Sequence, residues 1–281
     1  MLVDELNSLT LEQSIKFWDA LEVKHGVEGV RWLCTNDRYY LLVRMLGRVD
    51  ALHPWLYARC REVEKDPDNY LDLWAREHYK SSIITFAGTI QEIIRDPEIT
   101  IGIFSHTKGV ALKFWQQIKQ ELESNQLLVR AFPEIFYANP TKDSPRWSDQ
   151  KGLCVKRKTN PKEATIEAHG LVDGQPTGAH FKLRIYDDVV TVESVNTPEQ
   201  IQKTTKAWEL SDNLGMSGGR KWHIGTRYHF GDTYGIMLER KALKVRLYPA
   251  TDTGQPDGKP VLLPVSEWEQ KKILQDRKSV V

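Results

Sequence analysis

The chain has few cysteines and no excess of charge of either sign. Its 281 residues include only three cysteines, Cys34, Cys60 and Cys154, which lie far apart and show no CxxC or Cys/His ligand spacing. This pattern argues against a structural zinc and a disulfide framework, and it favours reduced thiols in the cytosol. Lysine plus arginine number 39 against 38 aspartates plus glutamates. No global basic field therefore indicates nucleic acid, and a binding surface would have to be a local patch.

Long apolar runs and a secretory signal are absent as well. No stretch approaches the roughly 18 to 20 apolar residues that span a bilayer. The N-terminal sequence "MLVDELNSLTLEQ" is acidic where a signal peptide would be basic and then apolar. We therefore expect a protein that is not secreted and has no membrane partner. The length is sufficient for one large α/β domain with an appendage.

Periodic apolar positions and capping residues predict a helical appendage over residues 1–65. Its first clear helix opens with a capping box formed by Thr10 and Gln13 and stops at Gly26. A second helix is predicted through "RYYLLVRML". A third is predicted to begin where Pro54 suits the first helical turn.

Over residues 66–281, short apolar runs alternate with longer periodic ones, which is typical of a parallel sheet with crossover helices. The predicted strands are "YLDLWA", "ITIGIFS", "FKLRIYDDVVT" and "GRKWHIGTRY". The predicted helices cover 81–95 and 109–128, begin at Pro198 with Thr197 as cap, and close the chain from Ser266. The expected fold class is therefore α/β, with a mainly parallel central sheet flanked by helices.

Polar clusters follow three of the predicted strands. They are Lys80-Ser81, Asp187-Asp188 and Thr226-Arg227. Ligands of open parallel sheets bind beyond the carboxyl ends of the strands, where such clusters would meet. A nucleoside triphosphate with magnesium needs a lysine at a helix N-terminus, a hydroxyl and a carboxylate for the metal, and a second carboxylate to orient the attacking water. Each cluster supplies one of these parts.

Each cluster taken alone also has a purely structural explanation. A Lys-Ser pair at a helix start is commonly only an N-cap, and an Asp-Asp pair at a strand end is commonly a solvated turn. The regular phosphate-loop pattern GxxxxGK followed by Ser or Thr is incomplete, because Trp74 and Tyr79 stand where its two glycines belong. The order of the three clusters on successive strands is what favours a nucleotide-hydrolysis site.

Four stretches of the chain resemble the ATPase domain of the bacteriophage terminase large subunit, the motor that packages DNA into phage heads. They are "LHPWLYARCREVE", "LDLWAREHYKSSIITFAGTIQEIIRDPEITIGIFSHT", "ATIEAHGLVDGQPTGAHFKLRIYDDVVT" and "WHIGTRYHFGD". The resemblance covers roughly residues 50 to 275. It implies a RecA-like P-loop ATPase of the ASCE type over 66–281.

The resemblance also implies a role for each cluster. This family has a deviant Walker A loop that opens with an arginine, here Arg76. The implied nucleotide-binding residues are Arg76, Glu77, His78, Tyr79, Lys80, Ser81 and Ser82. Asp187 and Ser81 would hold Mg²⁺, while Asp188 would polarise the attacking water beside the catalytic Lys80. The implied coupling motif that senses the γ-phosphate is Gly225, Thr226 and Arg227.

Cofactors and partners follow from the same resemblance. It implies ATP and Mg²⁺, double-stranded DNA, the portal protein and the small terminase subunit. It further implies a pentameric ring on procapsids in the host cytoplasm, with a monomer in isolation. The nuclease domain that normally follows has no counterpart in this sequence, so we predict no nuclease activity. Two alternatives stay open, a helicase-like ATPase and a DNA-binding scaffold with a degenerate nucleotide site.

Two groups of basic residues need a structure to interpret. The family's arginine finger commonly precedes the Walker B strand, but "DGQPTGAHF" contains no arginine, which leaves Arg146, Arg157 and Arg184 as substitutes. The densest basic segment is "KGLCVKRKTNPK", in which Lys156, Arg157 and Lys158 are candidates for contact with a DNA backbone. A solvated surface explains this segment equally well.

Overall fold

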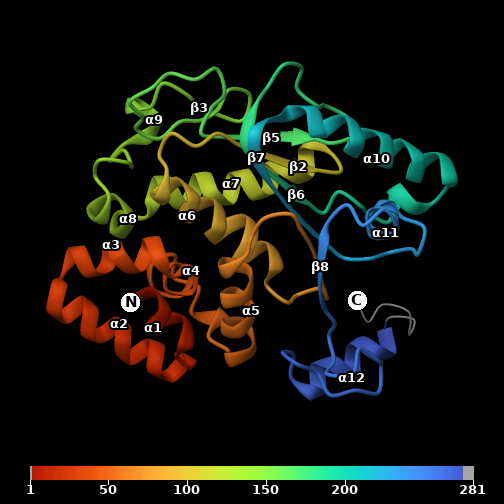
Figure 1. The fold of residues 1–281 in the computed structure, drawn as a ribbon, viewed down its shortest axis with the longest axis horizontal. Coiled ribbons are helices and arrows are strands. Elements are labelled where there is room, and N and C mark those ends of the chain that lie inside the picture. Colours follow the sequence, from red (N-terminus) through yellow and green to blue (C-terminus); the bar gives the residue numbers. More distant parts are fainter. Residues whose placement is uncertain (1, 275–281) are drawn as a thin grey trace. The chain divides into compact units, whose positions relative to one another are not determined.

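The computed structural model describes residues 2–274 and has an α/β fold (Figure 1). Eight strands form a mixed, mostly parallel sheet in the order β3-β4-β5-β2-β6-β7-β1-β8. The strands are β1 Tyr70–Trp74, β2 Ile101–Ser105, β3 Trp147–Ser148, β4 Gly152–Leu153, β5 Ile166–Gly170, β6 Phe181–Asp187, β7 Gly215–Gly225 and β8 Lys244–Tyr248. The α/β class and the mainly parallel sheet expected from the sequence are thus confirmed.

The chain divides into two compact units. Unit 1 comprises Met1–Asp66, Ser82–Ile99 and Trp115–Glu167, and unit 2 comprises Pro67–Ser81, Thr100–Phe114 and Ala168–Val281. The helical segment that precedes β1 therefore shares a unit with two later stretches of the chain. Helix α7, Lys108–Ser124, contains the boundary between Phe114 and Trp115.

Unit 1 is mainly helical. Its helices are α1 Leu2–Ser8, α2 Leu11–His25, α3 Val27–Asn36, α4 Arg38–Tyr40, the π-helix η1 Leu41–Met45, the 3₁₀-helix η2 Val49–Ala51, α5 Pro54–Lys65, the π-helix η3 Ser82–Ala87, α6 Gly88–Arg95, α8 Gln126–Ala131 and α9 Pro140–Asp143. The capping box is confirmed, since Thr10 N–H donates to Gln13 Oε1 at 2.9 Å and Gln13 N–H to Thr10 Oγ1 at 3.3 Å. Pro54 is the first residue of α5, as predicted.

Two helix predictions in unit 1 need correction. No helix was predicted directly after Gly26, where α3 starts. The single helix expected over 109–128 ends at Ser124, because the Asn125 side chain accepts hydrogen bonds from the N–H groups of Leu127 and Leu128 and so begins α8.

Polar side chains of the unit 1 helices bond one another, and of these Asp37 and Gln91 are buried. Arg61 donates to the fully buried Asp37 carboxylate at 2.7 Å, and Gln91 of α6 donates to Glu64 at 2.6 Å. Arg95, also on α6, bonds the same Glu64 at 3.0 Å. We call Asp37, Arg61, Glu64, Gln91 and Arg95 the unit 1 polar network. It fixes the end of α6 against α3 and α5.

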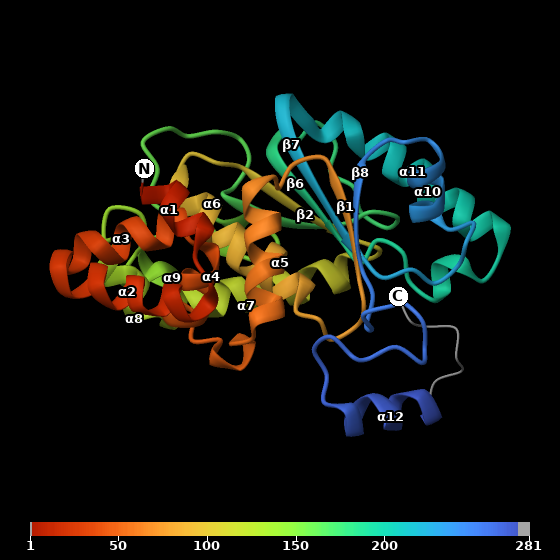
Figure 2. The same cartoon turned by 60° about the horizontal axis from the view of Figure 1, so that its bottom comes forward.

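Unit 2 is built on the five parallel strands β2, β6, β7, β1 and β8 (Figure 2). Its helices are α10 Pro198–Ser211, α11 Thr233–Glu239 and α12 Val265–Leu274, with 3₁₀ turns η4 Glu193–Val195 and η5 Asp212–Leu214. Tyr234 and Met237 of α11 pack with Leu71 and Leu73 of β1 and with Tyr186 of β6. This core packs α11 against β1 and β6. The predicted Thr197 cap of α10 is confirmed.

Strand β7 lies between β1 and β6. Leu73 of β1 is paired with Gly225 of β7, and Ile224 is paired with Asp187 of β6. The carboxyl ends of these three strands therefore lie at one edge of the sheet. Within residues 2–274, no helix is long and apolar enough to cross a membrane.

Candidate nucleotide-hydrolysis site

The loop after β1 contains no glycine, yet two of its residues adopt the left-handed backbone conformation that glycine favours. The loop covers residues 75–79, and helical backbone begins at Lys80. Glu77 and Tyr79 have positive φ angles of 63° and 60°. Side chains other than glycine rarely adopt this left-handed conformation, which costs roughly 1–2 kcal/mol per residue. The left-handed bend is thus retained at Tyr79, where the regular motif has glycine.

The helix that follows the loop is irregular where it starts. Residues Ser82–Ala87 form the π-helix η3, and α-helical geometry resumes at Gly88. Short π-helical segments are rare and occur frequently at functional sites. The first N–H groups of a helix have no partner within it, so the start of this helix can bind an anion.

The acid pair lies at the carboxyl end of β6. Asp187 is fully buried, whereas the Asp188 side chain is 36% exposed. The backbone of Asp188 has a φ of 50°, and it is held by hydrogen bonds from Asp188 N–H to Ile224 O at 3.1 Å and from His106 N–H to Asp188 O at 3.2 Å. This fixed turn directs two adjacent carboxylates to different environments.

The structure brings the acid pair to the loop. Ser81 Oγ donates to Asp187 Oδ1 at 3.2 Å, and Lys80 Nζ lies 3.8 Å from Asp188 Oδ1. The second distance is longer than a hydrogen bond, so the Lys80 ammonium keeps donors for another anion. All four side chains predicted to act on the phosphates, the metal and the water therefore lie in one cluster.

The donor set of this cluster fits magnesium. Asp187 and Ser81 offer only oxygen atoms, and Mg²⁺ in phosphate-transfer sites takes one or two protein oxygens together with substrate phosphates and waters. No group of three or more His, Cys, Asp or Glu side chains that could hold a metal occurs in the described part of the chain. A dedicated protein-only metal cage is therefore not what these residues form.

The predicted coupling motif follows the end of β7. A Cβ atom on Gly225 would lie 2.2 Å from Tyr234 Oη, so this position requires glycine. Thr226 Oγ1 donates to the Trp74 carbonyl at 3.2 Å. This bond connects the end of β7 to the start of the loop 75–79. Arg227 instead donates to Phe230 O at 3.3 Å within its own loop.

Burial shifts the pKa of two groups around the cluster. Burial raises the pKa of Tyr234, and the carboxylates of Asp188 and Asp187 raise it further. Burial lowers the pKa of His78, whose Nδ1 lies 2.7 Å from Arg76 O. Both groups are therefore neutral at pH 7, and they support the turn without adding charge.

Arg76 is connected to the loop after β7. Its guanidinium donates to Tyr228 Oη at 2.5 Å and lies 5.1 Å from the centre of that ring. Asp232 accepts from the backbone N–H groups of Tyr228 and His229, and it also caps α11 through Gly235 N–H at 2.8 Å. Sequence reasoning missed Tyr228 and Asp232. The Asp-Thr-Tyr-Gly stretch that starts at Asp232 has the form of a helix N-cap and was the available signal.

Most of the remaining basic candidates have other roles. Arg184 is 4% exposed, and it donates to Ser211 O and Asp212 O, so this residue cannot reach a neighbouring molecule. Arg157 donates to the Glu163 carbonyl, and Lys156 donates to Pro133 O at 2.8 Å. These bonds are within unit 1 and use only some of the donors of each side chain, so the role of Lys156, Arg157 and Lys158 as DNA contacts stays a prediction.

One basic candidate is exposed and one is partly exposed. Lys158 is exposed, and its backbone N–H donates to the Glu98 carboxylate. Arg146 is partly exposed and donates to the Lys162 carbonyl at 2.7 Å. Of the three arginines considered as fingers, Arg146 and Arg157 are thus partly exposed, and Arg184 is buried.

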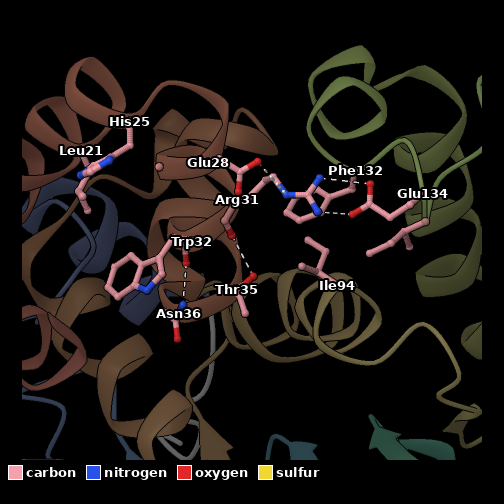
Figure 3. Close-up of a pocket in the computed structure, with 12 residues that line it drawn as sticks. Leu21, His25, Glu28, Arg31, Trp32, Thr35, Asn36, Ile94, Phe132 and Glu134 are labelled. Atoms are coloured by element: carbon pink, nitrogen blue, oxygen red, sulfur yellow. Dashed lines mark hydrogen bonds and ion pairs between the residues drawn. The ribbon is translucent and has the colours of Figure 1, made fainter. Parts of the chain in front are cut away.

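A cavity of about 520 Å³ lies in unit 1, and none of the predicted site residues lines it (Figure 3). Trp32, Ile94 and Phe132 contribute apolar surface to it, and the Arg31 guanidinium is paired with Glu134 and bonds Ala131 O. Arg31 is therefore already neutralised by its own chain. Glu28 lies 3.9 Å from the same guanidinium, so two carboxylates of the lining accompany this one cation.

Comparison of the chain with protein-family models and with curated proteins found no match. The geometry of the cluster is therefore the basis for assigning a function.

Proposed function

We propose that the chain is a Mg²⁺-dependent ATPase of the RecA-like P-loop class. The observation that carries this proposal is the hydrogen bond between Ser81 and Asp187, which are 106 positions apart. A helix-start hydroxyl and a strand-end carboxylate at this distance suit one metal ion and the phosphates bound to it. The strand order, with β7 between β1 and β6, is compatible with a RecA-like sheet.

Each residue of the cluster then has a chemical role. Lys80 neutralises the β- and γ-phosphates, which bind at the N-terminus of the helix. Asp188, close to Lys80 and partly exposed, orients the attacking water and accepts its proton. Ser81 and Asp187 would hold Mg²⁺, which when bound neutralises charge on the phosphate oxygens.

We further propose that this ATPase is the motor domain of a terminase large subunit, which drives double-stranded DNA into a procapsid. The similarity of residues 50 to 275 to that family supports this step. The portal protein, the small terminase subunit and a pentameric ring are proposed on the same basis. The partly exposed Arg146 is a candidate for the finger that one subunit supplies to the next.

The test is ATP turnover with Mg²⁺ by the wild type and by Lys80→Ala. We expect the substitution to lower turnover by about 10³-fold, because no other cation of the loop can replace the ammonium. Lys206→Ala, an exposed lysine of α10, is the matched control and should retain wild-type turnover. Turnover of Lys80→Ala within a few-fold of wild type would disprove the site.

Further assays separate the alternatives. A packaging motor should move DNA into procapsids without unwinding free duplexes, whereas a helicase-like ATPase should separate strands. A scaffold with a degenerate site should bind DNA and show no turnover at all. The loop without glycines favours the scaffold alternative, because the Tyr79 side chain stands where glycine would let phosphates approach the backbone closely.

A further inference from the structure

The phosphate loop contains an acid. Glu77 has a φ of 63°, and its side chain is 56% exposed at the loop surface. A carboxylate in this loop repels the polyphosphate that the loop is proposed to bind. The loop therefore needs a compensating positive charge in addition to Lys80.

Lys271 of α12 supplies a positive charge at this position. Its ammonium forms an ion pair with the Glu77 carboxylate, although the two residues are 194 positions apart in the chain. Lys271 is 24% exposed, so its side chain lies mostly against the protein rather than in solvent. No local sequence pattern predicts this contact.

Packing brings α12 to the loop. Trp268 is 7% exposed and forms a small apolar cluster with Ala75 and Ala250. Ala75 is the first residue after β1, and its N–H donates to Tyr248 O of β8 at 2.9 Å. Trp268 and Lys271 are three residues apart and so share one helix face. In Figure 2, α12 lies below the lower end of β1, from which the loop departs.

Lys271 is also within electrostatic range of the rest of the loop. The pKa of His78 is lowered first by burial, and the positive charges of Lys80 and Lys271 lower it further. Both ammonium groups thus act on the same short segment of backbone.

We propose that Lys271 is a positioning residue of the nucleotide site, whose ammonium neutralises Glu77 so that the loop accepts a nucleoside di- or triphosphate. This inference rests on the proposed function. Trp268 packs against Ala75 and so holds α12 at the loop, which makes α12 part of the nucleotide site.

The experiment measures the affinity of the full chain for a fluorescent ATP analogue. Lys271→Ala should bind about tenfold more weakly, because the Glu77 charge is then uncompensated beside the phosphates. Lys271→Arg should bind like the wild type. Glu77→Gln should bind a few-fold more tightly, and the double variant Glu77→Gln/Lys271→Ala should recover wild-type affinity within about twofold, since both charges are gone.

The matched control is Lys272→Ala. Lys272 is on the same helix and pairs with Glu269 instead of the loop, so its loss should leave affinity unchanged. Thermal unfolding of each variant shows whether α12 and the core stay folded. Recovery in the double variant would not occur if Lys271→Ala had merely damaged the fold.

The outcomes separate this inference from the proposed function. If the wild type binds the analogue and Lys271→Ala binds it equally well, the inference is wrong and the ATPase assignment stands. If Lys271→Ala binds weakly and Glu77→Gln does not restore binding, Lys271 acts on the phosphates directly and the counter-ion role is wrong. No binding by the wild type would overturn the proposed function, and this inference with it.

Discussion

Two clusters of charged side chains, the unit 1 polar network and the candidate site of unit 2, differ in the lengths of their contacts. In the unit 1 polar network, the contacts from Arg61 to Asp37 and from Gln91 to Glu64 are 2.7 and 2.6 Å long. In the candidate site, Lys80 and Asp188 are 3.8 Å apart.

The backbone differs in the same way. Asp37 has a φ of −136°, in the ordinary extended region, and Gln91 is in a regular α-helix. Glu77, Tyr79 and Asp188 all have positive φ angles. Backbone strain that persists at a cluster of polar groups is typical of functional sites. The closely paired charges of the unit 1 polar network hold the fold together, whereas Lys80 and Asp188 stay 3.8 Å apart beside strained backbone and so can contact a ligand.

The acid pair offers the largest expected effect. Asp188→Asn should bind ATP with near wild-type affinity and hydrolyse it about 10³-fold more slowly, because the amide cannot accept the proton of the water. Asp187→Asn should lose Mg²⁺-dependent binding as well. Binding titrations with and without Mg²⁺, together with single-turnover hydrolysis, distinguish the two. Equal losses of binding in both variants would refute this division of roles.

Breaking the unit 1 polar network should instead lower stability. Arg61→Ala leaves the Asp37 carboxylate buried without its guanidinium, and we expect the free energy of unfolding to fall by about 3–5 kcal/mol in a urea titration. Arg44→Ala, which breaks the more exposed pair with Asp19, should cost less than about 1 kcal/mol. Similar losses in the two variants would mean that the network is not a buried stabilising element.

The imidazole of His223 in β7 is fully buried, and it should make the stability of the protein depend on pH. His223 stacks on Tyr186 at 4.5 Å and accepts from Trp208 Nε1, and burial lowers its pKa to about 3. The unfolded chain protonates this imidazole below its ordinary pKa of about 6.5, whereas the folded chain does so only near pH 3. The contribution of His223 to the free energy of unfolding is therefore fully present above pH 6.5. As the pH falls below that value, this contribution is lost by about 1.4 kcal/mol per pH unit.

The measurement is the free energy of unfolding between pH 7 and pH 5. His223→Gln retains an acceptor for Trp208. Because the unfolded variant takes up about one proton fewer, the slope of the free energy of unfolding against pH should be lower than in the wild type. His25→Gln, at an exposed position, should leave the slope as in the wild type. An unchanged slope in His223→Gln would show that another group is responsible.

The smallest expected effect concerns the strained backbone of the loop. Tyr79→Asn should tolerate the φ of 60°, whereas the β-branched Tyr79→Val should be less stable than Tyr79→Asn by about 1–2 kcal/mol. Thermal unfolding of the two variants gives the difference. If Tyr79→Val is as stable as Tyr79→Asn, the left-handed conformation is not maintained in solution, and the contrast with the unit 1 polar network weakens.

Features with local signals were predictable from the sequence. Thr10, Pro54 and Thr197 each act on backbone groups within one helical turn, so the starts of α2, α5 and α10 could be read directly. Strand β8 was missed because it lies at the edge of the sheet, where its mixed burial gives a weak pattern. Helix α11 was missed because the Asp232 cap was not recognised.

The sequence by itself determined which polar residues end the strands: Lys80 and Ser81 after β1, the acid pair after β6, and Thr226 after β7. Only the tertiary structure decided that Ser81 meets Asp187, that Arg184 is buried, and that Lys271 reaches Glu77. The reason is that strand ends and helix caps depend on neighbours a few residues away. Strand order and the docking of α12 depend instead on packing between residues more than a hundred positions apart, for which a short stretch of sequence carries no signal.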